Sequence, residues 1–421
     1  MKNRRLLAIT ALLSGAVLLM SCSKSVKDDD SASDKAGGST STTEATTRTT
    51  RGVTDTSVKV GGIKYGLYFG DAELGVQARL KKANDAGGVN GRTIELVGVD
   101  ENNNNEDSGD QDRVKALVEQ KQVFALLPVM TGGFGGGDYV AEHNIPMFGW
   151  GINPAFCEGT SAFGITGCVT NPSLKIGSNA LGTSLKDMFD GDTNKTVAFI
   201  AEDNAAGKGG LVLLRNSVEN VGFKVVSADA SLPAPPEQPG DVSPFVNTLL
   251  TSNDGKAPDI IYIQATLAGT KISNALQTAG FKGMIITPSY SPILLGQPGY
   301  DGIYINTQLG MDPSIPANAE MMDAVHAIKP DQQMSLALIA GYYTADMFIK
   351  GLEATGKDLT VESFLKTMNK DFSYSVDGVV GKSEWPRNHE EPVPCSVMTK
   401  VENKKFDYIQ KLVCGTNIKI K

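Results

Sequence analysis

Short apolar runs alternate with amphipathic stretches along the chain from Ser57 onward. The runs Val58–Ile63, Val123–Val129 and Thr196–Ala201 have the length of a strand, and every residue of the second run is apolar. An unbroken apolar run is typical of a parallel strand that is buried on both faces. Between the runs, a segment such as Val76–Ala83 carries apolar residues at i, i+4 and i+7, which is the spacing of an amphipathic helix. This alternation predicts an α/β protein with parallel sheets and right-handed crossovers.

The number of predicted strands indicates two lobes, because about ten strands over about 365 residues are too many for one small core. One predicted helix includes Ile176. Later in the chain the pattern becomes more helical, with helices predicted at Ala317–Ala327 and Ser335–Thr355 and a third after Thr360. The tail from Val393 has the pattern of a two-stranded ribbon.

Residues suited to ligand binding follow two of these strands, and parallel sheets bind ligands at the carboxyl ends of their strands. The run that ends at Met130 continues into Thr131 and five glycines, and the strand Pro146–Phe148 leads into Trp150. A hydroxyl and bare backbone N–H groups before a helix start suit an anion such as a carboxylate. We therefore expect the two tips to form one wall of a small-molecule site. The alternatives are a flexible glycine loop and a core tryptophan. The glycines do not have the spacing of a nucleotide-binding loop.

The N-terminus has the parts of a secretory signal: a basic start, then the uncharged segment Leu6–Met20. The tetrapeptide Leu19–Cys22 resembles a bacterial lipobox, in which residues 1–21 are removed and Cys22 is lipidated. An ordinary signal with a chance cysteine is the alternative. Residues 22–52 then form the lipidated cysteine and a flexible tether, because this segment has almost nothing apolar to bury.

The chain is acidic, with a formal net charge of −8 at pH 7. An acidic surface argues against a nucleic-acid partner and against binding to anionic lipids. We therefore expect attachment to the membrane through the N-terminal lipid and not through basic residues.

Four cysteines remain beyond Cys22, and an even number in an exported chain indicates disulfides. Three pairings are possible, and we favour the one in which both disulfides close short local loops. A zinc site is the alternative, but the sequence has no C-x-x-C. The segment Asp100–Asp112 is similar to a calcium loop, yet Asn105 and Gln111 stand where glycine and glutamate are required, so we expect a solvated loop and no metal or other cofactor. The favoured pairs are Cys157 with Cys168 and Cys395 with Cys414.

Four segments carry a resemblance to a known family: VKVGGI, ANDAGGVNGRTIELVGVDENNN, VKALVEQKQVFALLPVMTG and NIPMFGW. Together they resemble the periplasmic binding proteins of the leucine/isoleucine/valine type, which are the substrate-binding subunits of ABC importers. The resemblance extends over roughly 54–415 and implies the type 1 fold, with two doubly wound parallel-sheet lobes joined by a three-crossing hinge. It places the first lobe at 57–172 plus 306–392, and the second at 173–305 plus 393–421.

The ligand contacts of this family come from strand tips, and the resemblance carries them to fourteen positions here. Amino-acid binders of this family have an acidic residue at one strand tip of the second lobe. The corresponding residues here are Pro288-Ser289-Tyr290, none of which is acidic. Asp71 or Asp203 could take that role, because a buried ammonium requires a nearby carboxylate. Five aromatic residues among the tips favour a partly apolar or aromatic ligand. The implied ligand-binding residues are Tyr65, Tyr68, Phe69, Met130, Thr131, Gly132, Trp150, Gly151, Asn204, Ala205, Gln264, Ala265, Ser289 and Tyr290.

The function implied is that of an exported, monomeric, lipid-anchored binding protein on the outer face of a bacterial membrane, which delivers a small molecule to an ABC transporter permease. The ligand would be a branched-chain amino acid or a related small carboxylate, amide or aromatic compound. A sensor subunit with the same fold is the first alternative, and an anchored enzyme the second. The sequence has no G-x-S-x-G or H-E-x-x-H motif. We interpret His143, His326 and His389 as structural or solvated.

Overall fold

The computed structural model describes residues 50–102, 108–157, 159–169, 175–234, 237–265 and 268–421, which belong to one compact unit of the chain. The predicted signal peptide, Cys22 and nearly all of the tether lie outside the described residues. Within the described part, no helix combines the length and the apolar character required to cross a membrane.

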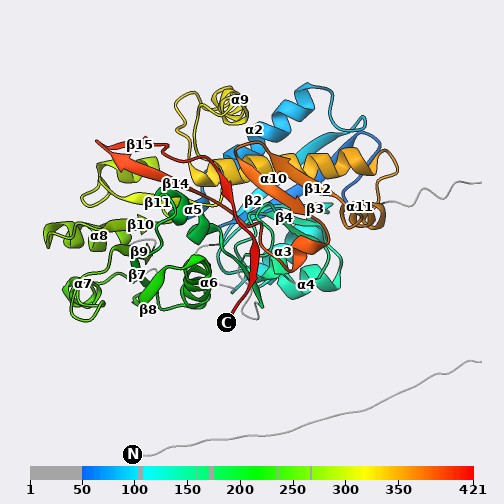
Figure 1. Ribbon diagram of the computed structural model, residues 1–421. Helices are drawn as coiled ribbons and strands as arrows, with labels where there is room; N and C mark the ends of the chain where they lie inside the picture. Colours follow the sequence, from blue (N-terminus) through cyan, green and yellow to red (C-terminus); the bar gives the residue numbers. More distant parts are fainter. Residues whose placement is uncertain (1–49, 103–107, 158, 170–174, 235–236, 266–267) are drawn as a thin grey trace, which may run out of the picture. The chain divides into compact units, whose positions relative to one another are not determined.

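The first sheet contains five parallel strands in the order β2-β1-β3-β4-β5 (Figure 1, blue to cyan). All six residues of β3 are buried, as its unbroken apolar run predicts. The order 2-1-3-4-5 is doubly wound, and its direction reverses between β1 and β3. Ligands bind at such a reversal, beyond the carboxyl ends of the strands. The strands are β1 (Ser57–Lys64), β2 (Thr93–Glu101), β3 (Ala125–Met130), β4 (Met147–Gly149) and β5 (Ala162–Gly164).

The second sheet contains eight strands, and its parallel part repeats the same order as β8-β7-β9-β10-β11. The tail adds antiparallel strands beside β11, so it extends this sheet and does not form a separate ribbon. The strands are β7 (Thr196–Glu202), β8 (Lys224–Leu232), β9 (Ile260–Gln264), β10 (Met284–Thr287), β11 (Tyr304–Thr307), β14 (Cys395–Glu402), β15 (Lys405–Asp407) and β16 (Val413–Cys414).

Two short antiparallel pairs complete the strands: β12 (Ser373–Val376) with β13 (Val380–Glu384), and β6 (Ile176–Ser178) with β17 (Asn417–Lys419). The prediction of a helix containing Ile176 was wrong, because this residue lies in β6 and the helix begins at Ala180. The partner strand of β6 is near the C-terminus, so no local pattern could indicate this pairing.

Helices flank both sheets. Against the first sheet, α10 contacts α2, β3 and β4; at the second sheet, α6 contacts β7, β8 and β9. The helices are α1 (Gly66–Phe69), α2 (Ala72–Asp85), α3 (Asp110–Lys115), α4 (Gly137–Glu142), α5 (Ala180–Met188), α6 (Ala205–Val221), α7 (Ser243–Leu250), α8 (Gly269–Thr278), α9 (Pro316–His326), α10 (Leu336–Thr355) and α11 (Val361–Met368), with a π-helical turn at Ala116–Gln120 and 3₁₀ turns at Pro154–Cys157, Pro292–Gly296 and Arg387–His389.

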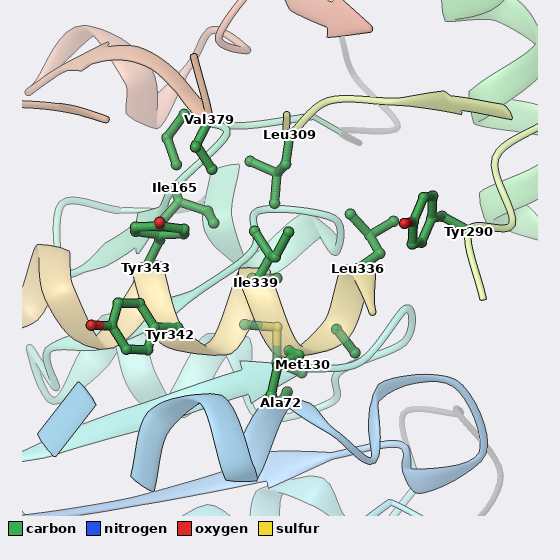
Figure 2. Packing of buried hydrophobic residues seen from close by; sticks show 14 of the residues in the cluster. Ala72, Met130, Ile165, Tyr290, Leu309, Leu336, Ile339, Tyr342, Tyr343 and Val379 are labelled. Atoms are coloured by element: carbon green, nitrogen blue, oxygen red, sulfur yellow. The ribbon is translucent and has the colours of Figure 1, made fainter. Parts of the chain in front are cut away.

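The central helix of the core is α10, which buries most of its residues. Ser335 begins it by accepting a hydrogen bond from the Leu338 N–H, 3.3 Å away, as a serine N-cap does. Figure 2 shows Met130 and Ala72 on one side of this helix and Leu309 on the other. An all-round apolar surface therefore allows α10 to pack against several elements at once.

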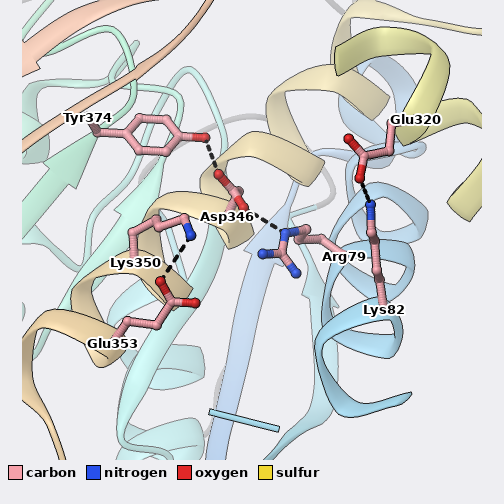
Figure 3. A network of polar contacts seen from close by, with 7 residues as sticks. All are labelled: Arg79, Lys82, Glu320, Asp346, Lys350, Glu353 and Tyr374. Carbon is pink, nitrogen blue, oxygen red and sulfur yellow. Dashed lines mark hydrogen bonds and ion pairs between the residues drawn. The ribbon is translucent and has the colours of Figure 1, made fainter. Parts of the chain in front are cut away.

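A polar network ties α10 to its neighbours (Figure 3). The guanidinium Nε of Arg79 on α2 lies 2.7 Å from Asp346 Oδ1, and the Tyr374 hydroxyl donates to Asp346 Oδ2 at 2.9 Å. Lys82 on α2 pairs with Glu320 on α9. These contacts fix α2, α9 and β12 around α10.

We call three segments the connecting segments: 165–169, which follows β5 of the first sheet, 308–310, which follows β11 of the second sheet, and 391–394, which precedes β14 of the second sheet. The first and third run antiparallel to each other: the Val393 N–H donates to the Thr166 carbonyl at 2.8 Å, and the Cys168 N–H to the Glu391 carbonyl at 3.1 Å. Both predicted disulfides are present and adjoin these segments; they join Cys157 to Cys168 and Cys395 to Cys414.

Candidate functional site

The tips of β1, β3 and β4 lie side by side at the reversal of the first sheet. Lys64 at the end of β1 is in register with Met130 at the end of β3, and Val129 is in register with Gly149. The Tyr65 N–H donates to the Met130 carbonyl at 3.0 Å, so the two tips are also joined by their backbones. The structure thus brings together the predicted residues of the first sheet.

Four aromatic rings from these tips form a continuous surface, which we call the aromatic wall: Tyr65, Tyr68, Phe69 and Trp150. Ring centroids are 5.1 Å apart for Tyr65 and Tyr68, 6.4 Å for Tyr68 and Phe69, and 6.0 Å for Phe69 and Trp150. Each pair is edge-on, which is a favourable geometry for aromatic rings. The wall thus joins rings that follow two different strands, β1 and β4.

Thr131 lies fully buried beyond the end of β3. Its carbonyl accepts a hydrogen bond from Asn153 Nδ2 at 3.1 Å, whereas its hydroxyl has no hydrogen-bond partner among the described residues. The helix expected directly after it, α4, does not begin until Gly137, so the anion site predicted at a helix start beside Thr131 is not formed in that way. Gly132, next along, is half-buried.

Gly151 is explained by packing. Its φ is +107°, and a Cβ atom at this position would lie 2.1 Å from the Gly167 carbonyl oxygen. Glycine is therefore required where Trp150 and the first connecting segment meet.

The tips of β7, β9 and β10 also share one edge, because Ala201 is in register with Gln264 and Tyr262 with Ile286. Asn204 caps α6 by accepting from the Gly207 N–H at 2.7 Å. Ala205 is the first residue of that helix.

The Gln264 amide lies against Gly210 of α6, where an added Cβ would be 2.0 Å from Nε2. Its Oε1 is buried and, in the part of the chain that the structure describes, accepts no hydrogen bond. Ala265 beside it is buried. Within the described residues, the Gln264 amide oxygen thus lacks a partner at the tip of β9, as the Thr131 hydroxyl does beyond the tip of β3.

Tyr290 is held by two residues that sequence reasoning missed. Its hydroxyl lies 2.7 Å from that of Tyr408, and its ring stacks on Phe406 with centroids 4.0 Å apart. Burial, with Tyr408 nearby, raises the pKa of Tyr290 well above its ordinary value. The preceding residue, Ser289, accepts a hydrogen bond at its carbonyl from Tyr300, at 2.5 Å. Phe406 and Tyr408 come from the tail, and no sequence pattern connects them with this tip.

The acids considered for a ligand ammonium are already engaged. Asp71 accepts a hydrogen bond from the Ser335 hydroxyl at 2.8 Å, and Asp203 is exposed and paired with Lys208 at 2.5 Å. A third acid was missed: Asp312 lies close enough to Tyr290 to contribute to its raised pKa. It follows the second connecting segment and not a strand, so a search of strand tips did not find it.

Both groups of tips contribute to one apolar cluster. Met130, Ala265 and Tyr290 belong to the same set of contacting buried residues, and Phe69 and Trp150 pack against it. A groove of about 190 Å³ lies elsewhere, between β8 and α7, and is lined by none of the predicted residues. A smaller cavity of about 10 Å³ beside Ser289 and Tyr300 has room for about one water molecule.

The described residues contain no group of three or more side chains that could hold a metal ion. Two doubly wound sheets whose parallel strands end side by side form the architecture in which α/β proteins bind small molecules.

The chain belongs to the periplasmic binding protein family, whose model matches residues 63–405. The solved structures to which the chain is similar include solute-binding and substrate-binding proteins of transporters. No curated protein matches the sequence.

Among solved structures, the chain is similar to an ABC transporter solute-binding protein from R. palustris in complex with 4-hydroxybenzoate (16% identity, 85% of this chain and 97% of that chain, TM-score 0.67). It is also similar to a fatty acid ABC transporter substrate-binding protein from Thermomonospora curvata (18% identity, 88% of this chain and 94% of that chain, TM-score 0.64). A third similar structure is that of a branched-chain amino acid transporter substrate-binding protein from Streptococcus pneumoniae in complex with isoleucine (18% identity, 85% of this chain and 99% of that chain, TM-score 0.64). At these identities the similarity shows the fold.

Proposed function

We propose that this protein captures a partly apolar small molecule between the tips of its two sheets and delivers it to an ABC importer. The observation that carries the proposal is the aromatic wall at the tips of β1 and β4, together with the Thr131 hydroxyl beyond β3, which has no hydrogen-bond partner among the described residues. A ligand ring or chain would cover the wall, and a polar end would meet Thr131 and Gln264. The two lobes would be 57–172 plus 306–392 and 173–305 plus 393–421.

The ligand class follows from the charges near the tips. Lys64 is paired with Glu73, so the nearest base at the β1 tip already has a carboxylate partner. A ligand carboxylate would thus rely on hydroxyl, amide and backbone donors. We propose an aromatic or branched aliphatic compound with one small polar group.

The test is a thermal-shift screen of the purified chain against branched-chain amino acids, amides, short carboxylates and hydroxybenzoates. A compound present at a hundred times its dissociation constant adds roughly 2.7 kcal/mol to the free energy of unfolding. A hit should also change the fluorescence of Trp150, and this change should disappear in Trp150→Phe. A hit whose affinity is the same in Trp150→Ala and in wild type would place the site elsewhere.

We also propose that the protein is held at the outer face of the membrane by lipid on Cys22. The motif Leu19–Cys22 and the polar segment after it support this. The Cys22→Ala variant should no longer be found in the membrane fraction of detergent-free lysates. If this variant still sediments with membranes as wild type does, the anchor is not a lipid on Cys22.

A further inference from the structure

The indole of Trp150 is bonded to a residue outside the predicted tips. Its Nε1–H donates to Oε1 of Gln308, 3.2 Å away. Gln308 directly follows β11 and begins the second connecting segment. Both side chains are half-buried, so water competes less for this bond than at an exposed site.

The first connecting segment holds the backbone of the same tryptophan, and the third connecting segment is bonded to the first. The Trp150 carbonyl accepts from the Thr166 N–H at 3.1 Å and from the Thr166 hydroxyl at 2.6 Å. The carbonyl of Thr166 in turn accepts from the Val393 N–H at 2.8 Å. Hydrogen bonds therefore link all three connecting segments to Trp150, two of them directly.

The indole also makes apolar contacts, since Trp150 packs against the large apolar cluster. Phe69 meets it edge-on, with centroids 6.0 Å apart and an interplanar angle of 88°. Ring contacts restrain an indole only weakly in its orientation. A hydrogen bond to its single donor restrains it more specifically, because the acceptor decides the direction in which the N–H edge points. Without an acceptor at position 308, Trp150 would keep its packing and lose its fixed orientation.

We propose that Gln308 is a positioning residue, which orients the indole of Trp150 and so ties the aromatic wall to the segments that connect the two sheets. The consequence of this inference rests on the proposed function: a ligand that covers Trp150 would perturb the hydrogen bond between Trp150 and Gln308. The orientation itself can be tested without a ligand.

The experiment reads the indole N–H signals of the full chain by NMR. The chain has two tryptophans, and Trp150→Phe assigns them. The Nε1 of Trp385 is buried and bonded to none of the described residues, so its signal is an internal reference for an unbonded indole. In Gln308→Leu, the Trp150 signal should move toward the unbonded position and its hydrogen exchange should become about fivefold faster, the equivalent of one ordinary hydrogen bond.

Three further variants make the test specific. Gln308→Glu keeps an acceptor and should preserve the signal. Gln308→Met keeps the length of the side chain without an acceptor and repeats the test if the leucine variant folds poorly. Gln333→Leu makes the same change at an exposed position and should leave the signal unchanged.

An unmoved Trp150 signal in folded Gln308→Leu or Gln308→Met, or an equal change in Gln333→Leu, overturns the inference. Because no small molecule is added, a failed ligand screen would refute the proposed function and leave this result standing. The two proposals can thus fail separately.

Discussion

Thr131 is fully buried beyond the tip of β3, yet its hydroxyl meets no partner within the described structure. Leaving a buried hydroxyl unsatisfied costs about 1–3 kcal/mol, which a polar ligand atom would recover. Thr131→Val keeps the shape and removes the hydroxyl. We expect the free protein to unfold at the same urea concentration or a higher one, and the thermal shift caused by a bound ligand to fall.

Thr344 in α10 provides a matched control, because its hydroxyl is also buried without a partner among the residues described. Thr344→Val should stabilise the free protein in the same way and leave the ligand-induced shift intact. If Thr131→Val and Thr344→Val gave identical ligand responses, Thr131 would not contact the ligand.

His389 makes stability depend on pH. Its ring packs against Phe163 and Trp385, and burial lowers its pKa to about 4. Since the unfolded chain takes up this proton near pH 6.5, the contribution to stability is complete above that pH and is lost as the pH falls toward 4. The loss is on the order of 3 kcal/mol for a shift of this size.

The measurement is urea unfolding at several pH values between 7 and 4. In His389→Gln the slope of stability against pH should be shallower in this window. His326→Gln changes an exposed histidine and should keep the wild-type slope. Equal slopes in all three proteins would show that His389 is not the group that titrates.

At the scale of elements, α6 explains how the Gln264 amide is accommodated. A glycine in a helix is less favourable than alanine by about 1 kcal/mol, so Gly→Ala normally stabilises. At Gly209 an added methyl group meets nothing within 4 Å, and Gly209→Ala should gain about that amount. At Gly210 it would lie 2.0 Å from Gln264 Nε2, so Gly210→Ala has to displace the amide and should gain less or lose stability.

This pair of adjacent variants also tests the site. Displacing Gln264 should weaken ligand binding in Gly210→Ala, whereas Gly209→Ala should bind as wild type does. Isothermal titration with a compound from the screen gives both affinities. Equal affinities would remove Gln264 from the proposed site.

For the whole molecule, the two disulfides hold the chain where the connecting segments pass. Each closes a short loop, with sequence separations of 11 and 19 residues. The loop-entropy model gives about 3 kcal/mol for a loop of this size. We expect Cys157→Ser/Cys168→Ser and Cys395→Ser/Cys414→Ser each to lower the free energy of unfolding by about this amount.

Urea unfolding with and without reductant measures the effect, and each double variant serves as the control for the other. Reductant should destabilise the wild type by more than it destabilises either variant. Non-reducing peptide maps should contain only the two local pairs. A peptide that links Cys157 to Cys395 would contradict this arrangement.

Much of the fold follows from local pattern. The all-apolar run at β3, the amphipathic spacing of α2 and the Thr360 cap of α11 each specify an element through the residues of that element alone. The local pattern also predicts which residues lie at the strand tips, because a parallel sheet places the residues after each strand at one edge. The local disulfide pairs follow from short separations in an exported chain.

The sequence by itself therefore determined most of the elements, the α/β class and the residues beyond the strands. Only the tertiary structure decided which distant residues support them: Tyr408 at Tyr290, Gln308 at Trp150, and β17 beside Ile176. The physical reason is range. Periodicity records which face of an element is buried, but the partner of a side chain is set by packing between segments more than a hundred residues apart, and a single sequence carries no local signal of that contact.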